Sequence, residues 1–282
     1  MGTGSTGKVS TAPDFGSSIT AFFRLLFYVA FTLPCMPLQA LAVKFNWPLR
    51  KRLPRWYHRQ CCRILGLQVQ IVGQPSKVHP TLFAANHVSY LDITVLSSLL
   101  PMSFIAKSEV ARWPFFGWLA KLQETIFVER RARKAMTDRD EMTKRLERGD
   151  DLTLFPEGTS GDGQWVLPFK SALFSVAEKS YGSTPLYVQP VSITYTRLDG
   201  APMGRYLRPL FAWFGDMELA SHLWQALRMG LVTVVVEFHP PKTLEELGSR
   251  KKMSDYCYEL VSNGVSEALA GRRFGKGQTK TA

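Results

Sequence analysis

Short apolar runs alternate with amphipathic stretches along the chain from Gly66 onward. Runs that alternate polar and apolar side chains, or that are rich in β-branched residues, predict strands at residues 67–72, 82–85, 103–106, 125–128, 152–155, 186–194 and 232–238. Helical spacing of apolar residues predicts helices after Leu91 and at residues 138–148, 171–179 and 250–270. Strands interleaved with helices in this way are typical of an α/β fold, here a mixed sheet flanked by helices.

The first 65 residues show a different pattern. Residues 1–18 are rich in Gly, Ser and Thr, and we expect them to be disordered. Residues 25–43 are apolar and uncharged, close to the roughly 20 residues that a helix needs to cross a bilayer. Pro34 and Pro37 predict that this helix is kinked or broken. No small-residue cleavage site follows, so we expect a membrane span or a surface-lying segment and not a signal peptide.

Basic and aromatic residues follow the apolar segment directly. They are Lys44, Trp47, Arg50, Lys51, Arg52, Arg55, Trp56, Tyr57, Arg59 and Arg63. Basic residues beside a membrane segment face the cytoplasm and attract anionic headgroups, and aromatic residues favour the interface. The net charge of +12 would also suit nucleic acid, but no nucleic-acid-binding motif is present, which leaves a merely solvated basic helix as the alternative.

These patterns divide the chain into four parts. We expect residues 19–65 to anchor the protein at the cytoplasmic face of the inner cell membrane, against an anionic surface. We expect residues 66–272 to form the α/β domain, and residues 273–282 to form a basic tail. No internal repeat and no linker interrupt the sequence after Gly66.

Cysteine usage and the absence of nucleotide motifs exclude several other kinds of protein. Cys35, Cys61, Cys62 and Cys257 have no metal-ligand spacing, which indicates buried thiols in a reducing compartment. The sequence has no P-loop, no complete dinucleotide-binding fingerprint and no Gly-x-Ser-x-Gly elbow. We also expect no metal site, because the candidate acidic residues lack a second histidine beside them.

Residues 84–92 read Ala-Ala-Asn-His-Val-Ser-Tyr-Leu-Asp and join a predicted strand to a predicted helix. The imidazole of His87 can take a proton from a hydroxyl group near neutral pH and return it later. The carboxylate of Asp92 can fix the tautomer of that imidazole, provided that the chain folds His87 back over the first helical turn. The alternative is a plain capping box, in which Ser89 caps the helix, Asp92 bonds back to it and His87 is an ordinary loop residue.

A second polar stretch, residues 151–163, reads Asp-Leu-Thr-Leu-Phe-Pro-Glu-Gly-Thr-Ser-Gly-Asp-Gly. A short strand leads into a loop with Glu157 and three glycines. Glycine allows a backbone to turn its N–H groups toward an anion or a developing oxyanion. We therefore expect Gly158 and Thr159, or the start of the helix after His87, to stabilise a negatively charged intermediate.

The two stretches together resemble the paired signature of the lysophospholipid acyltransferases, the 1-acylglycerol-3-phosphate O-acyltransferase family. The resemblance extends over residues 67–194 and implies the glycerolipid acyltransferase fold. It implies that His87 and Asp92 are catalytic and that Asn86, Glu157, Gly158 and Thr159 contact substrate. Lys107 and Arg130 resemble the family's basic positions that hold a phosphate of the acceptor or of the acyl carrier, although each could be a surface cation at a strand end.

The resemblance also implies the reaction and its partners. The enzyme would move a fatty acyl group from acyl-CoA or acyl-carrier protein to the free hydroxyl of a lysolipid, with no other cofactor. A catalytically inactive lipid-binding scaffold and a lipid acyl hydrolase are the alternatives. Acyl-chain length, the choice of donor and the oligomeric state are not evident from the sequence.

One residue departs from the family pattern. Members that form phosphatidate carry arginine after Glu-Gly-Thr, where this chain has Ser160. Without the guanidinium, a bidentate phosphate contact is lost. The surrounding residues resemble the bacterial branch that acylates lyso-ornithine lipid, whose headgroup is a zwitterionic amino acid with an ammonium group that Asp162 or Glu157 would suit.

Overall fold

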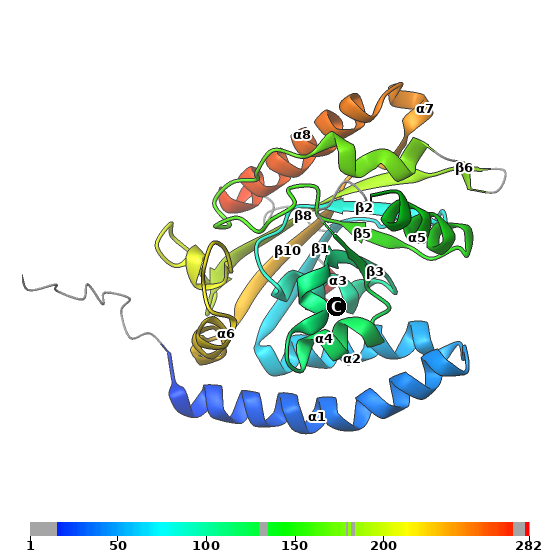
Figure 1. The fold of residues 1–282 in the computed structure, drawn as a ribbon. Coiled ribbons are helices and arrows are strands. Elements are labelled where there is room, and N and C mark those ends of the chain that lie inside the picture. The colour runs from blue at the N-terminus through cyan, green and yellow to red at the C-terminus, as the bar shows by residue number, and fades with distance from the viewer. Residues whose placement is uncertain (1–15, 130–134, 179, 182–183, 273–279, 282) are drawn as a thin grey trace, which may run out of the picture.

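The computed structural model describes residues 16–129, 135–178, 180–181, 184–272 and 280–281. The expected disordered N-terminus and basic tail therefore fall largely outside the described residues. A ten-stranded sheet runs through the domain in the order β12-β1-β10-β8-β2-β5-β3-β4, with β9 and β11 paired to β8 (Figure 1). Its strands are β1 Leu67–Gly73, β2 Thr81–Ala85, β3 Ser103–Lys107, β4 Ile126–Val128, β5 Leu152–Leu154, β8 Tyr187–Leu198, β9 Ala201–Pro202, β10 Val232–Phe238, β11 Lys242–Thr243 and β12 Lys280–Thr281.

Strand direction divides the sheet into two parts. β8, β2, β5, β3 and β4 run parallel to one another, whereas β10 pairs antiparallel with β8 and β1 runs parallel to β10. A separate hairpin joins β6 Ser180–Tyr181 to β7 Thr184–Pro185. The mixed sheet expected from the sequence is confirmed, and the carboxyl ends of its parallel strands share one edge.

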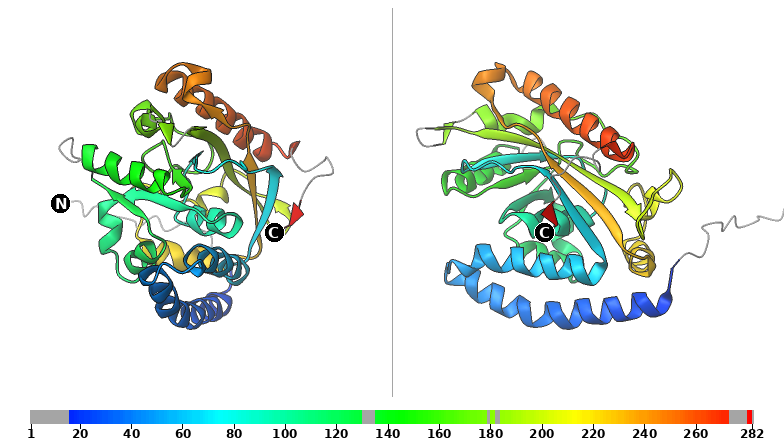
Figure 2. Two further views of the ribbon diagram at one scale, coloured as in Figure 1. Left: turned by 90° about the vertical axis from the view of Figure 1, so that its right-hand side faces the viewer. Right: turned by 180° about the vertical axis from the view of Figure 1, so that it is seen from behind.

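Helices cover both faces of the sheet (Figures 1 and 2). Helix α8 and the 3₁₀ helix η3 lie over one face, and α3 covers the other, with α2 and then α1 packed outside it. The helices are α1 Ser18–Lys44, α2 Leu49–Leu65, α3 Leu91–Leu99, η1 Ser108–Arg112, α4 Phe116–Leu122, α5 Ala135–Glu147, η3 Ser171–Glu178, η4 Arg208–Leu210, α6 Leu219–Arg228, α7 Leu244–Leu247 and α8 Arg250–Leu269.

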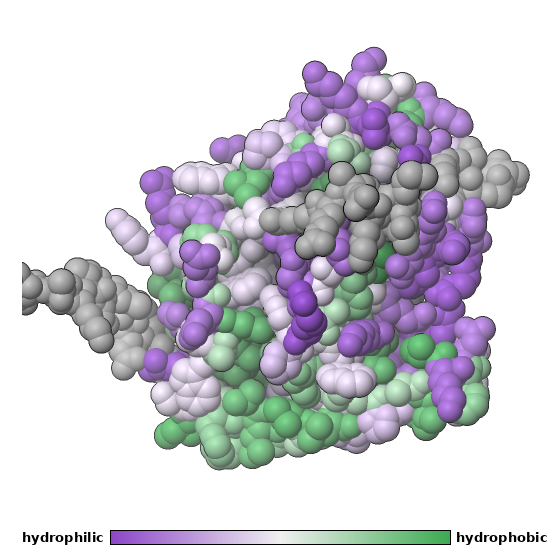
Figure 3. All heavy atoms as spheres, in the orientation of Figure 1, coloured by the Kyte–Doolittle hydropathy of each residue, from purple (hydrophilic) through white to green (hydrophobic). Residues whose placement is uncertain are grey.

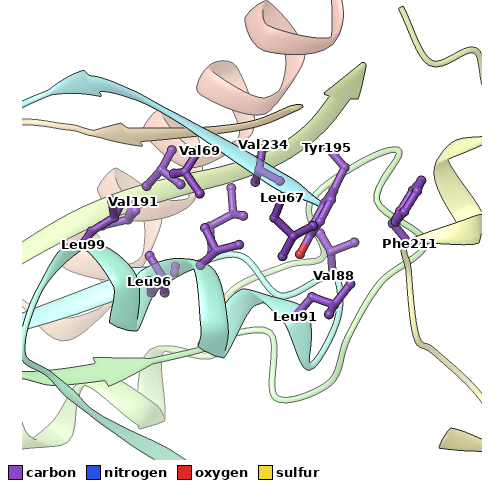
Figure 4. Packing of buried hydrophobic residues seen from close by; sticks show 14 of the residues in the cluster. Leu67, Val69, Val88, Leu91, Leu96, Leu99, Val191, Tyr195, Phe211 and Val234 are labelled. Atoms are coloured by element: carbon purple, nitrogen blue, oxygen red, sulfur yellow. The ribbon is translucent and has the colours of Figure 1, made fainter. Parts of the chain in front are cut away.

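The core has two halves, one on each face of the sheet. Along β2, Phe83 and Ala85 face the α3 side, and Leu82 and Ala84 face the α8 side. All five residues of β2 are buried, as expected for a central strand that is covered on both faces. Figure 4 shows the α3 side, where leucines of α3 pack against valines of β1, β8 and β10.

Helix α1 is not broken, because it continues as one helix through Pro34 and Pro37. Contacts with α2 hold it on both sides of the prolines. Before them, Thr32 Oγ1 lies 2.8 Å from the hydroxyl of Tyr57. Beyond them, Gln39 donates its amide to the carbonyl of Arg50 at 3.0 Å. These two contacts fix α1 against α2 on either side of the backbone hydrogen bonds that the prolines remove.

Several further elements differ from the expectation. Residues 171–178 form a 3₁₀ helix, and neither α4 nor α6 was predicted. The signal for α6 was present, since Leu219, Leu223, Ala226 and Leu227 follow helical spacing.

Gly264 of α8 provides a test of this packing. A methyl group at this position would fall against Ser192 Oγ and lie 2.8 Å from His239 Nε2, and these two buried groups are themselves hydrogen-bonded at 3.0 Å. Overpacking of this kind costs about 1–3 kcal/mol, so Gly264→Ala should lower the free energy of unfolding despite alanine's better helix propensity. Gly204→Ala is the control, because a methyl group there meets no atom within 4 Å. Denaturant unfolding that gave equal stability for the two variants would contradict this packing.

Candidate active site

The polar residues predicted to be functional gather where two neighbouring parallel strands end. β2 ends at Ala85 and leads into the loop with His87, and β5 ends at Leu154 and leads into the loop with Glu157. The two loops therefore leave the same edge of the sheet side by side. Rigid strands behind them fix where their side chains point.

His87 and Asp92 form a hydrogen-bonded pair. His87 Nδ1 lies 2.9 Å from Asp92 Oδ2, and the same oxygen accepts the N–H groups of Val88 at 2.7 Å and Ser89 at 2.9 Å. Asp92 Oδ1 accepts the hydroxyl of Tyr195 at 2.9 Å. Because the carboxylate is an acceptor only, the neutral imidazole carries its proton on Nδ1 and leaves the lone pair of Nε2 for a substrate.

Tyr195 was not among the residues expected to be functional. Burial raises the pKa of its hydroxyl well above the usual range, and the charge of Asp92 raises it further, so the hydroxyl stays protonated and donates. Its position is evident afterwards from the two-residue period of β8, which places Tyr195 on the same face as Val191 and Ile193 (Figure 4).

One half of the capping alternative is present beside the catalytic pair. Asp92 accepts the N–H of Ser89, as a capping box requires, but Ser89 Oγ accepts the N–H of Leu91 at 3.3 Å, and the N–H of Asp92 donates to the carbonyl of Ser89 instead. The residue that orients His87 therefore also fixes the first turn of α3. One carboxylate serves both purposes because its two oxygens can accept four hydrogen bonds.

Two other loops hold the backbone of the catalytic residue. The N–H of His87 donates to Glu157 Oε1 at 2.7 Å, and its carbonyl accepts the N–H of Gly161 at 2.9 Å. The carbonyl of Val88 accepts the N–H of Trp213 at 2.9 Å. With the Val88 N–H on Asp92, all four polar backbone atoms of residues 87 and 88 are hydrogen-bonded. The position of the imidazole is thus fixed from several directions.

Glu157 is buried and uses both carboxylate oxygens on backbone donors. Its Oε2 accepts the N–H of Leu167 at 2.9 Å, opposite the bond from His87 to Oε1. Burial raises the pKa of Glu157 to about 7; the two N–H donors oppose the rise, and the charge of Asp92 adds to it. A substrate contact was expected for Glu157, but in the structure it positions His87.

The amide of Asn86 also binds the protein backbone. Its Nδ2 donates to the carbonyl of Ile193 at 2.9 Å, and its Oδ1 accepts the N–H of Ile193 at 2.7 Å. The side chain continues the β2–β8 ladder by one step after β2 ends at Ala85. This residue too was expected to contact substrate, and the structure shows it buried beneath the site.

An aromatic stack supports the imidazole from one side. The ring of Phe155 lies 4.1 Å from that of His87, centroid to centroid, with 21° between the planes. Phe104 of β3 continues the stack at 6.2 Å from Phe155. Phe155 is the first residue of the Phe-Pro-Glu-Gly-Thr motif, but the sequence pattern predicted it only as the last residue of a strand.

The N–H groups available for an oxyanion are fewer than expected. Those of Val88 and Ser89 bind Asp92, and that of Gly158, in a left-handed conformation with φ of 69°, donates to the carbonyl of Phe155 at 3.0 Å. Within the described parts of the chain, the N–H of exposed Thr159 has no hydrogen-bond acceptor. Of the donors expected in the two loops, Thr159 is therefore the best placed to receive a new negative charge.

A cation that the prediction did not include lies beside this loop. A Cβ atom added to Gly158 would come within 2.7 Å of Lys170 Nζ, so the ammonium group rests directly over the glycine. Lys170 follows the loop closely, and its N–H donates to the carbonyl of Pro156 at 2.9 Å. Only glycine at position 158 allows this close approach.

The two cations named from the sequence lie farther along the same edge or outside the described residues. Lys107 ends β3, two strands from β2, which corresponds to about 10 Å across the sheet. Its side chain is half-buried. Arg130 lies outside the described residues, so the structure does not locate it.

An apolar cavity of about 180 Å³ lies between the N-terminal helices and the rest of the domain. Residues of α1, α2, α3, β3, α4 and α6 line it. Phe104 belongs both to its wall and to the surroundings of the catalytic pair, because it stacks on Phe155, whose ring stacks on His87. The cavity therefore approaches His87 through this aromatic stack.

Comparison with known proteins agrees with this geometry. A family model described as Acyltransferase matches residues 68–194. A lyso-ornithine lipid O-acyltransferase of Brucella abortus is 42% identical over 91% of this chain and 98% of its own length. This chain belongs to the acyltransferase family. A 1-acyl-sn-glycerol-3-phosphate acyltransferase of Neisseria gonorrhoeae is 33% identical to the acyltransferase described here, over 72% of this chain and 76% of its own length.

A solved structure shares the fold of the acyltransferase. The crystal structure of the 1-acyl-sn-glycerophosphate acyltransferase from Thermotoga maritima aligns with a TM-score of 0.62 and 21% sequence identity. The alignment covers 93% of this chain and 96% of the other. The sequence-based expectation of a lysolipid acyltransferase with this fold is confirmed.

A second histidine–aspartate pair supplies the control for a test of the catalytic pair. His79 Nδ1 lies 2.9 Å from Asp151 Oδ2, but both residues precede their strands and so lie at the opposite edge of the sheet. His87→Ala should lower kcat by about 10³-fold or more, because no other group can replace the general base, while His79→Ala should leave kcat within about twofold. Equal losses in steady-state kinetics would contradict the assignment.

Glu157 leads to a pH-dependent prediction. Its pKa of about 7 in the folded protein exceeds the unfolded value near 4.5, so its contribution to stability is fully present below about pH 4.5 and is lost as the pH rises through 7. Glu157→Gln cannot ionise. The free energy of unfolding of wild type relative to Glu157→Gln should therefore fall by up to about 3 kcal/mol between pH 4.5 and 8. If the difference in free energy of unfolding between wild type and Glu157→Gln stayed constant across this pH range, the assignment would be refuted.

Proposed function

We propose that this acyltransferase moves a fatty acyl group from an acyl thioester to the free hydroxyl of lyso-ornithine lipid, at the cytoplasmic surface of the inner membrane. The observation that carries the proposal is Ser160, which stands where phosphatidate-forming members carry arginine. Relatives named lyso-ornithine lipid O-acyltransferase share more of this sequence than those named for 1-acyl-sn-glycerol-3-phosphate. An acceptor without a phosphate monoester needs no guanidinium at that position.

The catalytic pair performs the first step. Nε2 of His87 takes the proton from the lysolipid hydroxyl, and Asp92 stabilises the imidazolium that forms. The hydroxyl oxygen bonds to the thioester carbonyl carbon, and the electron pair of the C=O bond moves to its oxygen. The N–H of Thr159 and the ammonium group of Lys170 are the groups placed to stabilise this oxyanion.

The second step expels the thiol and completes the ester. The oxyanion electrons re-form the carbonyl, the carbon–sulfur bond breaks, and the leaving thiolate takes the proton from His87 Nε2. The enzyme thereby returns to its starting protonation state without a covalent intermediate. The products are a diacylated lipid and free CoA or carrier protein.

The apolar cavity supports the placement of an acyl chain. Its lining is mostly apolar, and Phe104 connects it to the stack on His87. A chain in this cavity would present its carbonyl carbon toward the imidazole. Both acyl-CoA and acyl-carrier protein offer the same thioester, so the cavity fits either donor.

Helix α1 supports a location on the membrane surface. By length and composition it is able to cross a bilayer, yet its inner side packs against α2, α4 and α6. Arg24 fastens it to the end of α6 by donating to the carbonyls of Leu227 at 3.2 Å and Met229 at 2.5 Å. A helix held against the domain in this way favours an orientation in the membrane plane over a span.

The outer side of α1 supplies the apolar surface that such a location requires (Figure 3). Large exposed apolar side chains follow helical spacing there, namely Ile19, Phe22, Phe23, Leu26, Phe27, Leu33, Leu38 and Leu41. Exposed Trp47, Trp56 and Trp118 lie on the neighbouring segments, as in the aromatic belts of membrane proteins. The basic residues of α2 would then meet anionic headgroups.

A thiol-release assay with palmitoyl-CoA tests the proposed acceptor, with protein reconstituted in nanodiscs of anionic lipid. Lyso-ornithine lipid should give a kcat/KM at least about tenfold above that of lysophosphatidate. Equal or greater use of lysophosphatidate would contradict the proposal. Fatty acid release without any acceptor would instead identify a hydrolase. No thiol release here or with an acyl-carrier-protein donor would indicate an inactive scaffold.

A further inference from the structure

Three hydrogen bonds close a ring around the catalytic loop. Gly161 donates its N–H to the carbonyl of His87 at 2.9 Å, and Trp213 donates its N–H to the carbonyl of Val88 at 2.9 Å. The hydroxyl of Ser160 donates to the carbonyl of Trp213 and joins the two outer segments to each other. Two segments 53 residues apart in sequence are thereby linked through one serine side chain.

The Trp213 side chain connects this ring to the wall of the apolar cavity. Its indole packs edge-to-face on Trp113, with centroids 5.3 Å apart, and on Tyr90 at 6.1 Å. Both partners line the cavity. The indole N–H donates to the carbonyl of Met217 at 2.8 Å and so holds residues 213–217 as one turn. A displacement of Trp213 would therefore alter both the catalytic loop and the cavity wall.

The hydroxyl of Ser160 suits this bond for a simple geometric reason. It lies one bond beyond Cβ and donates a single proton. In arginine the nearest donor, Nε, is three bonds beyond Cβ, so an arginine at this position cannot make the same hydrogen bond without moving the backbone. Position 160 can therefore hold an arginine that binds an acceptor phosphate or a serine that closes the ring of hydrogen bonds, but not both.

We infer that Ser160 and Trp213 together determine acceptor specificity. With the ring closed, position 160 presents no cation to the acceptor, and Trp213 fixes the loop that adjoins the catalytic residue. This arrangement selects a lysolipid whose headgroup lacks a phosphate monoester. The inference rests on the proposed function and adds the residues that choose between acceptors. Ser160 and Trp213 act by positioning, since neither touches the reacting atoms.

Four variants in the full-length protein test the inference, with palmitoyl-CoA as donor and lyso-ornithine lipid or lysophosphatidate as acceptor. Ser160→Ala removes one hydrogen bond and should lower kcat/KM for lyso-ornithine lipid about fivefold, while Ser160→Thr keeps the hydroxyl and should stay within about twofold of wild type. Ser160→Arg should raise the ratio of lysophosphatidate to lyso-ornithine lipid turnover about tenfold or more. Ser221→Ala is the matched control.

Ser221 suits that purpose because it is exposed at the start of α6 and its hydroxyl also donates to a backbone carbonyl, that of Glu218 at 3.1 Å. Thermal unfolding of all four variants separates a folding defect from a change in specificity, and Ser160→Ala and Ser160→Thr suffice if Ser160→Arg does not fold. Wild type that prefers lysophosphatidate would overturn the proposed function. Wild type that prefers lyso-ornithine lipid, with variants that keep both its rate and its acceptor ratio, would overturn this inference alone.

Discussion

The buried carboxylate of Asp92 is the group on which the geometry of the active site depends. It has no exposed surface, and a charge in that position is stable only when its oxygens are hydrogen-bonded. Two backbone N–H groups, the Tyr195 hydroxyl and the imidazole of His87 supply those bonds. Because the donors come from the catalytic loop and from β8, satisfying this one charge places His87 at the end of β2 and sets its tautomer.

Residues outside the catalytic pair further restrict the position of His87. Glu157 accepts the N–H of His87, and N–H groups of Gly161 and Trp213 donate to the carbonyls of His87 and Val88, so two other loops hold one dipeptide. The Phe155 ring stacks on the imidazole of His87 and also on Phe104, which lines the apolar cavity. The proposed acid–base chemistry, acyl-chain placement and acceptor choice would then depend on side chains that contact one another around His87.

Much of this was predictable from the sequence, and the exceptions have physical reasons. Apolar periodicity located the strands, and the resemblance of two short motifs to the acyltransferase family identified His87 and Asp92 as the pair, because both signals are local. Tyr195 and Trp213 could not be assigned, since their partners lie more than 100 residues away and depend on strand order. The family resemblance led us to expect that Asn86 and Glu157 contact substrate; only the fold shows that backbone groups are hydrogen-bonded to both side chains.

The tautomer of His87 tests the central claim most directly. Nitrogen-15 NMR of the protein labelled at histidine, at a pH where the ring is neutral, distinguishes a protonated Nδ1 from a protonated Nε2. We predict that His87 carries its proton on Nδ1, and that Asp92→Asn abolishes this preference because an amide at that position can donate as well as accept. A wild-type signal showing the proton on Nε2 would contradict the account, because the base would then have no lone pair for the acceptor hydroxyl.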